Sequence, residues 1–188
     1  MGLSEINFAV LVASLIVAST PLVLAALGEL IVEKSGVLNL GVEGMMIIGA
    51  VTGFIVGVET GSAYIGMMAA AMAGALLSLL FGFIILIMQA NQVASGLALT
   101  IFGLGIAALM GHPYTGIKSP QISTISIPIL SEIPILGTMF FQHDLIVYLS
   151  LISVLTIWYF LTRMRAGLIL RSVGEDHDVA HSLGYRVI

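Results

Sequence analysis

Charged residues are distributed unevenly along this chain, and long apolar stretches separate them. The stretch from Thr60 to Ile117 holds 58 consecutive residues without Asp, Glu, Lys or Arg. A helix that crosses the ~30 Å hydrocarbon core of a bilayer needs about 20 apolar residues at ~1.5 Å rise per residue. This stretch is therefore long enough for two spanning helices and a short turn, and the pattern predicts an integral membrane protein.

The remaining charges and turn residues predict an all-α, polytopic transmembrane helix bundle of about five spans. The first apolar stretch has no Lys or Arg before it, which distinguishes it from a cleavable signal peptide and favours a retained span. We expect residues 1–162 to form the bundle, within a single incomplete domain that ends in residues 163–188. The predicted spans are residues 6–28, 40–58, 63–88, 93–110 and 145–162, with an outer loop at 111–144.

The second span is the least regular of the five. Only 15 residues, 44–58, separate Glu43 from Glu59, which is about 22 Å of helix and too short to cross. Either the helix begins near Asn39 and carries Glu43 inside the membrane edge, or the bilayer is thinner there. A carboxylate in the first turn of a helix is also favoured by the helix dipole, so Glu43 has a purely structural interpretation as well.

Basic residues indicate the orientation of the chain. If the spans alternate, Lys34 shares a side with Arg163, Arg165, Arg171 and Arg186, and Lys118 lies alone on the other side. Because cytoplasmic loops carry an excess of Lys and Arg, this distribution predicts a cytoplasmic C-terminal segment and an N-terminus outside.

The outer loop contains apolar residues paired with prolines, at Ile127-Pro128 and Ile133-Pro134. We expect these pairs to form short pieces that lie on the membrane surface rather than a further crossing.

Composition excludes several classes of function. Hydrophobic residues make up 59% of the chain and charged residues 9%, against about 25% charged in soluble domains. The net charge of −4 argues against a nucleic-acid partner, which needs a basic patch to displace phosphate counterions. Cysteine is absent, so this chain forms no disulfide and no thiolate metal site.

Small residues recur at helical spacing on two of the predicted spans. Helices in lipid are not driven together by the hydrophobic effect, so close approach at small residues supplies much of their packing. We interpret these faces as helix-packing surfaces, with the lining of a pathway as the alternative. They consist of Gly49, Gly53 and Gly57 on span two, and Gly66, Ala70 and Gly74 on span three.

Four polar residues near the predicted membrane boundaries are candidates for a translocation pathway: Asn39, Glu43, Asn91 and Gln92. A charge fully inside the membrane costs at least ~2.5–3.5 kcal/mol, so a functional Glu43 would need a partner such as Lys34 or Asn39. The amide side chains suit a ribose or a base, but they can equally satisfy a neighbouring helix. Both interpretations stay open on the sequence alone.

The segments outside the spans carry most of the remaining polar residues. Glu29, Glu33 and Lys34 are expected in a solvated turn. In the C-terminal segment, Gly174 offers a turn, and a short helix should follow it. Its expected features are an N-cap at Asp176, a dipole-stabilising Asp178, an apolar face of Val179 and Leu183, and a stop at Gly184.

This short helix raises two further points. About two turns of helix are too short to be stable alone in water, so we expect the helix to dock on its own bundle or on a partner. His177 and His181 have the i, i+4 spacing of metal ligands, but no third ligand is evident, and a solvated face is the preferred interpretation.

Three ordered motifs resemble the permease subunits of ABC importers, in the branch for nucleosides and simple sugars that is related to branched-chain amino-acid permeases. The motifs are SGVLNLGVEG at 35–44, NQVASGLAL at 91–99, and LRSVGE at 170–175 followed by AHSLG at 180–184. The chain departs from the family pattern at Asp176 and His177, where Asn-Pro is usual, and at His181, a commonly basic position. Family members are longer, so the chain resembles the N-terminal part of a permease.

The resemblance implies a function and a set of partners. The C-terminal segment resembles the coupling helix that docks on the ATPase subunit, and we call residues 163–188 the coupling segment. Its implied contact residues are Arg171, Gly174, Glu175, Asp176, Asp178, Ala180, Leu183 and Gly184. The implied partners are an ABC ATPase subunit, a second permease subunit in a homo- or heterodimer, an extracytoplasmic substrate-binding protein and the lipid bilayer of a bacterial inner membrane.

The sequence therefore predicts a permease subunit for a nucleoside or a simple sugar, not an enzyme, because no phosphate-binding loop or catalytic constellation occurs. No cofactor is expected. The alternative is a secondary transporter or channel driven by an ion gradient, for which Glu43 is the only candidate carboxylate near the membrane interior. A membrane scaffold without transport would explain the glycine faces but not the cytoplasmic helix.

Overall fold

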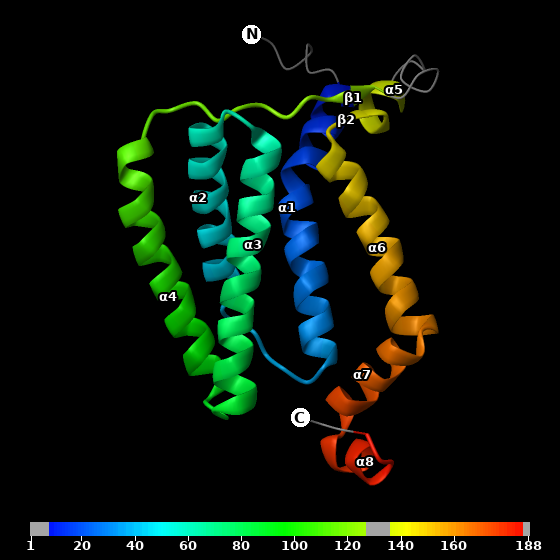
Figure 1. The fold of residues 1–188 in the computed structure, drawn as a ribbon. Helices are drawn as coiled ribbons and strands as arrows, with labels where there is room; N and C mark the ends of the chain where they lie inside the picture. Colours follow the sequence, from blue (N-terminus) through cyan, green and yellow to red (C-terminus); the bar gives the residue numbers. More distant parts are fainter. Residues whose placement is uncertain (1–7, 127–135, 186–188) are drawn as a thin grey trace. The chain divides into compact units, whose positions relative to one another are not determined.

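The computed structural model describes residues 8–126 and 136–185, and it is helical almost throughout (Figure 1). Within these residues, five helical stretches are long and apolar enough to cross a membrane, which confirms the predicted fold class. The predicted start of the first span at Ile6 and the pairs Ile127-Pro128 and Ile133-Pro134 lie outside the described residues. The five stretches are Phe8–Lys34, Val42–Thr60, Ala63–Ile87, Gln92–Tyr114 and Leu145–Arg163.

The helices and strands follow one another with short connections. The elements are α1 (Phe8–Lys34), α2 (Val42–Thr60), α3 (Ala63–Gly82), the π-helix η2 (Phe83–Ile87), α4 (Gln92–Gly111), the 3₁₀ turn η3 (His112–Tyr114), β1 (Ile125–Ser126), α5 (Leu136–Phe140), β2 (Gln142–His143), α6 (Leu145–Arg163), α7 (Arg165–Glu175) and α8 (His177–Ser182).

Helix α1 continues beyond the predicted end of the first span at Gly28. The expected solvated turn at Glu29, Glu33 and Lys34 is wrong, because these residues form the last turns of α1. Gly28 has open space around its Cα and no proline follows it, so nothing stops the helix there. The helix ends instead at Lys34, and the following turn contains Gly36, whose φ of +87° is a left-handed conformation that glycine adopts easily.

Two compact units make up the described chain. The first contains the part of α1 up to Gly28 together with Ser123–Leu168. The second contains Glu29–Ile122 together with the chain from Ile169 onward. The candidate site lies entirely within the second unit, so the packing of that unit matters most here.

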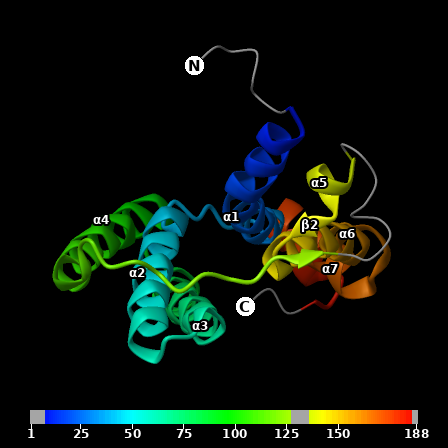
Figure 2. The ribbon, with the colours of Figure 1, turned by 90° about the horizontal axis from the view of Figure 1, so that it is seen from above.

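Helix α2 lies between α3 and α4 in the second unit (Figure 2). Its side toward α3 carries the glycine face that the sequence indicates. A Cβ on Gly66 of α3 would lie 2.5 Å from the carbonyl oxygen of Gly53, and one on Gly49 would lie 3.2 Å from that of Ala70. Gly74 is less tightly packed, since its Cβ would be 4.0 Å from the carbonyl oxygen of Met45. Backbone thus packs directly on backbone between these helices.

The side of α2 that faces α4 uses glycines that lie outside the predicted packing faces. A Cβ on Gly44 would lie 2.6 Å from the Leu99 carbonyl oxygen, and one on Gly103 would lie 2.8 Å from Gly44 Cα. Around this contact, a small core forms from buried Met45, Phe81, Ile85 and Leu99. The start of α2 is therefore held against the middle of α4.

The first unit contains short elements inside the predicted outer loop. Strands β1 and β2 pair antiparallel, with Ile125 opposite His143. The imidazole Nε2 of buried His143 lies 2.8 Å from the carbonyl oxygen of Met139 in α5. Asp144 then begins α6, because its side chain accepts a hydrogen bond from the Val147 amide at 3.2 Å.

Candidate functional site

The coupling segment contains two helices, and their junction differs from the predicted one. Gly174 was expected to form a turn, but it lies within the last turn of α7. The chain breaks instead at Asp176, which has extended backbone angles of φ −155° and ψ 109°. Asp176 is the N-cap of α8, as predicted, and its Oδ1 accepts hydrogen bonds from the amides of Asp178 and Val179 at 3.0 Å each. The side-chain cap explains why the break falls there.

Helix α8 ends as the sequence predicts. Gly184 has a φ of +87°, its amide donates to the His181 carbonyl at 2.9 Å, and the Tyr185 amide donates to the Ala180 carbonyl at 3.2 Å. This pair of bonds is a Schellman C-cap. Ala180 is buried, whereas Val179 and Leu183 are 53% and 69% exposed. The predicted apolar face therefore exists, and no described residue covers it.

Gly174 packs on the turn that follows α1. A Cβ at Gly174 would overlap the Lys34 carbonyl oxygen and would lie 2.7 Å from the Gly36 amide nitrogen. In the other direction, a Cβ at Gly36 would lie 3.0 Å from Gly174 Cα and 3.1 Å from Cε1 of His177. Both residues must be glycine for the two backbones to approach this closely. The end of α7 is thus seated directly on the end of α1.

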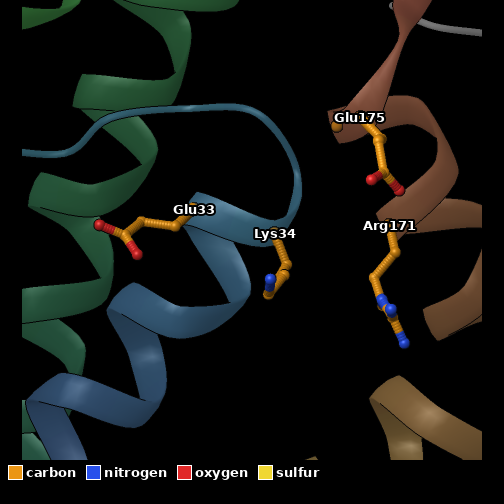
Figure 3. A pocket seen from close by; sticks show the side chains of 5 residues that line it. Glu33, Lys34, Arg171 and Glu175 are labelled. Carbon is orange, nitrogen blue, oxygen red and sulfur yellow. The ribbon is translucent and has the colours of Figure 1, made fainter.

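A cavity of about 220 Å³ opens beside this contact (Figure 3). Lys34 reaches it from α1, and Arg171 and Glu175 reach it from α7, while the Glu33 side chain leaves α1 in a different direction from Lys34. Two cations and two carboxylates around one cavity suit charged side chains of a partner protein, which could pair with them. Arg171 and Glu175 belong to the predicted contact residues, whereas Glu33 and Lys34 were expected in a solvated turn.

Three of the four candidate pathway residues bond to the backbone. Gln92 Oε1 accepts from the Leu38 amide at 2.8 Å, and Asn91 Oδ1 accepts from the Ala94 amide at 3.0 Å as the N-cap of α4. Asn39 is buried, and its Oδ1 accepts from the Gly41 amide at 3.0 Å. Glu43 is exposed in the first turn of α2, and its carboxylate has no hydrogen-bond partner within the described chain.

Other polar residues at this end of the second unit are not among the predicted site residues. The Thr100 hydroxyl donates to the Leu40 carbonyl at 2.9 Å, and Glu29 Oε1 accepts from the Asn39 amide at 3.2 Å. Glu29 Oε2 is buried without a hydrogen-bond partner in the described chain. A Ser-Gly pair after a helical run was a usable signal for the turn at Gly36. No local pattern indicates Thr100, because its partner is 60 residues away.

The histidines of the coupling segment have local surroundings. His177 Nδ1 lies 2.5 Å from the Val173 carbonyl oxygen, and the ring packs beside Gly36. Within the described residues, no group of three or more His, Cys, Asp or Glu side chains is placed to hold a metal ion. His177 and His181 have the i, i+4 spacing of metal ligands, but neither the sequence nor the described part of the structure supplies a third ligand.

Replacing Asp176 with alanine should fray α8. The carboxylate satisfies two amides, and the loss of such a cap costs about 1 kcal/mol, or roughly a fivefold rise in local opening. Hydrogen–deuterium exchange of a peptide that covers residues 177–183 measures this opening. Asp176→Asn is the matched control, because asparagine caps helices equally well. Equal exchange in the two variants would show that the cap does not hold the helix.

The helical spans define a class of protein, a multi-pass membrane protein. The chain belongs to the family described as "Branched-chain amino acid transport system / permease component", which it matches over residues 11–188.

Individual relatives extend this assignment. The chain is 38% identical to the "Putative glucose ABC transporter permease protein TsgC13" of Haloferax volcanii, over 90% of this chain and 53% of the relative. It is 36% identical to the guanosine ABC transporter permease protein NupQ of Bacillus subtilis and 32% identical to the nucleoside ABC transporter permease protein NupC of Lactococcus lactis. Each of these two matches covers 95% of this chain and 60% of the relative.

The chain thus spans between half and two thirds of the length of these relatives. No solved structure matches it significantly.

Proposed function

We propose that this chain is part of the transmembrane permease subunit of an ABC importer that takes up a nucleoside or a simple sugar. The observation that carries this proposal is the seating of Gly174 on the turn at Gly36, beside a capped helix with an exposed apolar face. Helix α8 thus offers an exposed face to a partner, and α7, which precedes it, is in backbone contact with the end of α1. The similarity to permeases named for glucose, nucleosides and guanosine supports the substrate class.

The partner of α8 in this proposal is the ATPase subunit. Val179 and Leu183 offer an apolar contact, and the cavity of Lys34, Arg171 and Glu175 offers charged groups next to it. A short helix of this kind becomes stable when it docks on a partner surface. ATP hydrolysis in the partner would then move α8, and α8 would move the end of α7.

The remaining partners follow from the proposed orientation. The excess of Lys and Arg supports an orientation with the coupling segment in the cytoplasm and the N-terminus outside a bacterial inner membrane. The 111–144 side would then receive substrate from an extracytoplasmic binding protein. A second permease subunit, identical or related, would complete the pathway, because alternating access generally needs two repeats that move against each other.

Glu43 is the residue of the pathway set that we retain for contact with substrate. The structure gives Asn39, Asn91 and Gln92 backbone partners, whereas the Glu43 carboxylate is exposed at the start of α2. A carboxylate at this position can accept hydrogen bonds from sugar or ribose hydroxyl groups.

Uptake by the complete transporter, reconstituted in vesicles with its ATPase and its binding protein, tests this function. We expect labelled guanosine or glucose to accumulate only with ATP and the binding protein, and vanadate to stop accumulation. Unlabelled nucleosides and sugars added in competition identify the substrate class. Uptake that a protonophore abolishes and vanadate leaves unchanged would instead support a transporter driven by an ion gradient.

A further inference from the structure

We infer that residues 35–41, the α1–α2 connection, transmit movement of the α7–α8 junction to α4, and that Thr100 and Gln92 are the positioning residues that hold this connection on α4. The inference rests on the proposed function, since it assumes that a partner moves α8. It assigns to Gln92 a role in transmission instead of contact with the substrate. It also assigns a role to Thr100, which no sequence pattern indicates.

One end of the connection is fixed to the coupling segment. Gly36 and Gly174 approach so closely that a Cβ on either residue would meet backbone atoms of the other at 3.0 Å or less. The His177 ring, in the first turn of α8, packs against Gly36 as well. A displacement of the α7–α8 junction toward α1 therefore pushes on the backbone of the connection, because no flexible side chain lies between them.

The other end of the connection is fixed to α4. The Leu38 amide donates to Gln92 at 2.8 Å, and the Leu40 carbonyl accepts from Thr100 at 2.9 Å. Gly96 lies beneath them, and a Cβ there would be 3.0 Å from the amide nitrogens of both Leu40 and Gly41. Gln92, Gly96 and Thr100 are spaced four residues apart, so they form one face of α4 that carries the connection.

The connection is short, so it cannot absorb much displacement between its two ends. Only Val37 lies between Gly36 and Leu38, and these two backbone steps reach about 7 Å when fully extended. Asn39 stiffens the segment, because its buried side chain bonds the Gly41 amide and its own amide bonds Glu29. Movement at Gly36 is therefore passed on to α4 rather than absorbed by the loop.

The hydrogen bond of Thr100 differs from those of serine and threonine hydroxyls elsewhere in the helices. Ser150, Ser153, Thr156 and Thr162 each donate to a carbonyl three or four residues earlier in their own helix. Thr100 instead donates to a carbonyl of another segment, 60 residues away in sequence. Its hydroxyl thus joins α4 to the connection, and a valine of nearly the same shape would break that link alone.

Thr100→Val tests the inference in the complete transporter. We expect the number of ATP molecules hydrolysed per substrate molecule transported to rise about fivefold or more, the lower end of the usual range for coupling between sites. Thr100→Ser keeps the hydroxyl and should restore the wild-type ratio. Thr156→Val, which removes a hydroxyl bonded only within α6, is the matched control and should leave the ratio unchanged. Gln92→Met, which removes the acceptor for Leu38, should raise the ratio in the same way.

A second measurement separates transmission from a merely structural effect. Because the chain has no cysteine, single cysteines at Leu183, the C-cap of α8, and at Val93 on α4 can report the effect of ATP on labelling rate. In Thr100→Val, labelling at position 183 should still respond to ATP, while the response at position 93 should be lost. ATP responses at both positions, or a wild-type ratio of ATP to substrate, would overturn the inference.

Failure of the proposed function gives a different result. In that case the wild-type transporter itself would show no ATP-dependent uptake and no ATP response at position 183. Both the proposed function and the inference would then fall, whereas loss of the response at position 93 in Thr100→Val alone supports both.

Discussion

Gly174→Ala should uncouple ATP hydrolysis from uptake in the complete transporter while leaving membrane insertion intact. The new methyl group would overlap the Lys34 carbonyl oxygen and would lie 2.7 Å from the Gly36 nitrogen and the Ser35 carbonyl carbon. These are backbone atoms that cannot swing aside, so the end of α7 must leave the turn at Gly36. Overpacking of this kind typically costs 1–3 kcal/mol, and we expect about tenfold less substrate transported per ATP.

Gly28→Ala is the matched control for this substitution. Gly28 also lies within a helix, but a Cβ there meets nothing within 4 Å. If Gly174→Ala and Gly28→Ala transport equally well per ATP, the contact between α7 and the α1–α2 connection does not carry the coupling.

Replacing Glu175 by glutamine should also weaken coupling, but less than Gly174→Ala does, because the exposed Glu175 side chain lines the cavity and is not part of the backbone contact.

Gly66→Leu should separate α2 from α3 and destabilise the bundle. A Cβ at this position would lie 2.5 Å from the Gly53 carbonyl oxygen and 3.0 Å from Gly57 Cα, so even a methyl group forces the helices apart. We expect the solubilised transporter to lose about 1–3 kcal/mol of stability, seen as a lower midpoint of thermal unfolding.

Gly82→Leu is the control for this effect. It lies in the same helix as Gly66, and a Cβ there meets nothing within 4 Å. The two variants add the same apolar side chain to the same element, so their difference isolates the packing of α2 on α3. Equal unfolding midpoints for Gly66→Leu and Gly82→Leu would contradict the backbone contact between these helices.

Local chemistry explains why parts of the coupling segment could be predicted and other parts could not. Asp176 caps α8 through amides two and three residues away, and Gly184 ends it through bonds within the same turn. Both features lie within a few residues, so the sequence displays them directly. Gly174 has an equally local interpretation as a turn, which is wrong, because its real constraint is a contact with Lys34 and Gly36, more than 130 positions earlier.

The same distinction applies to the glycines and amides of the bundle. The repeat of Gly49, Gly53 and Gly57 is visible because its members share one helix face, whereas the contact of Gly44 with Gly103 joins two helices and has no such repeat. Asn39 and Gln92 are polar residues near the membrane edge, but the sequence does not reveal which backbone groups their side chains hydrogen-bond. That choice depends on how the α1–α2 connection lies on α4.

The sequence by itself determined that this chain crosses a membrane several times, because each charged side chain placed in lipid has a large cost of its own and the charge-free stretches show where that cost is avoided. It also determined the ends of α8. Only the tertiary structure decided that the coupling segment rests on the end of α1 and that the α1–α2 connection is bonded to α4. The free energy of membrane insertion is a sum of contributions from single residues. The contacts of the coupling segment and of the α1–α2 connection instead pair residues far apart in the chain, and they exist only once the helices have packed.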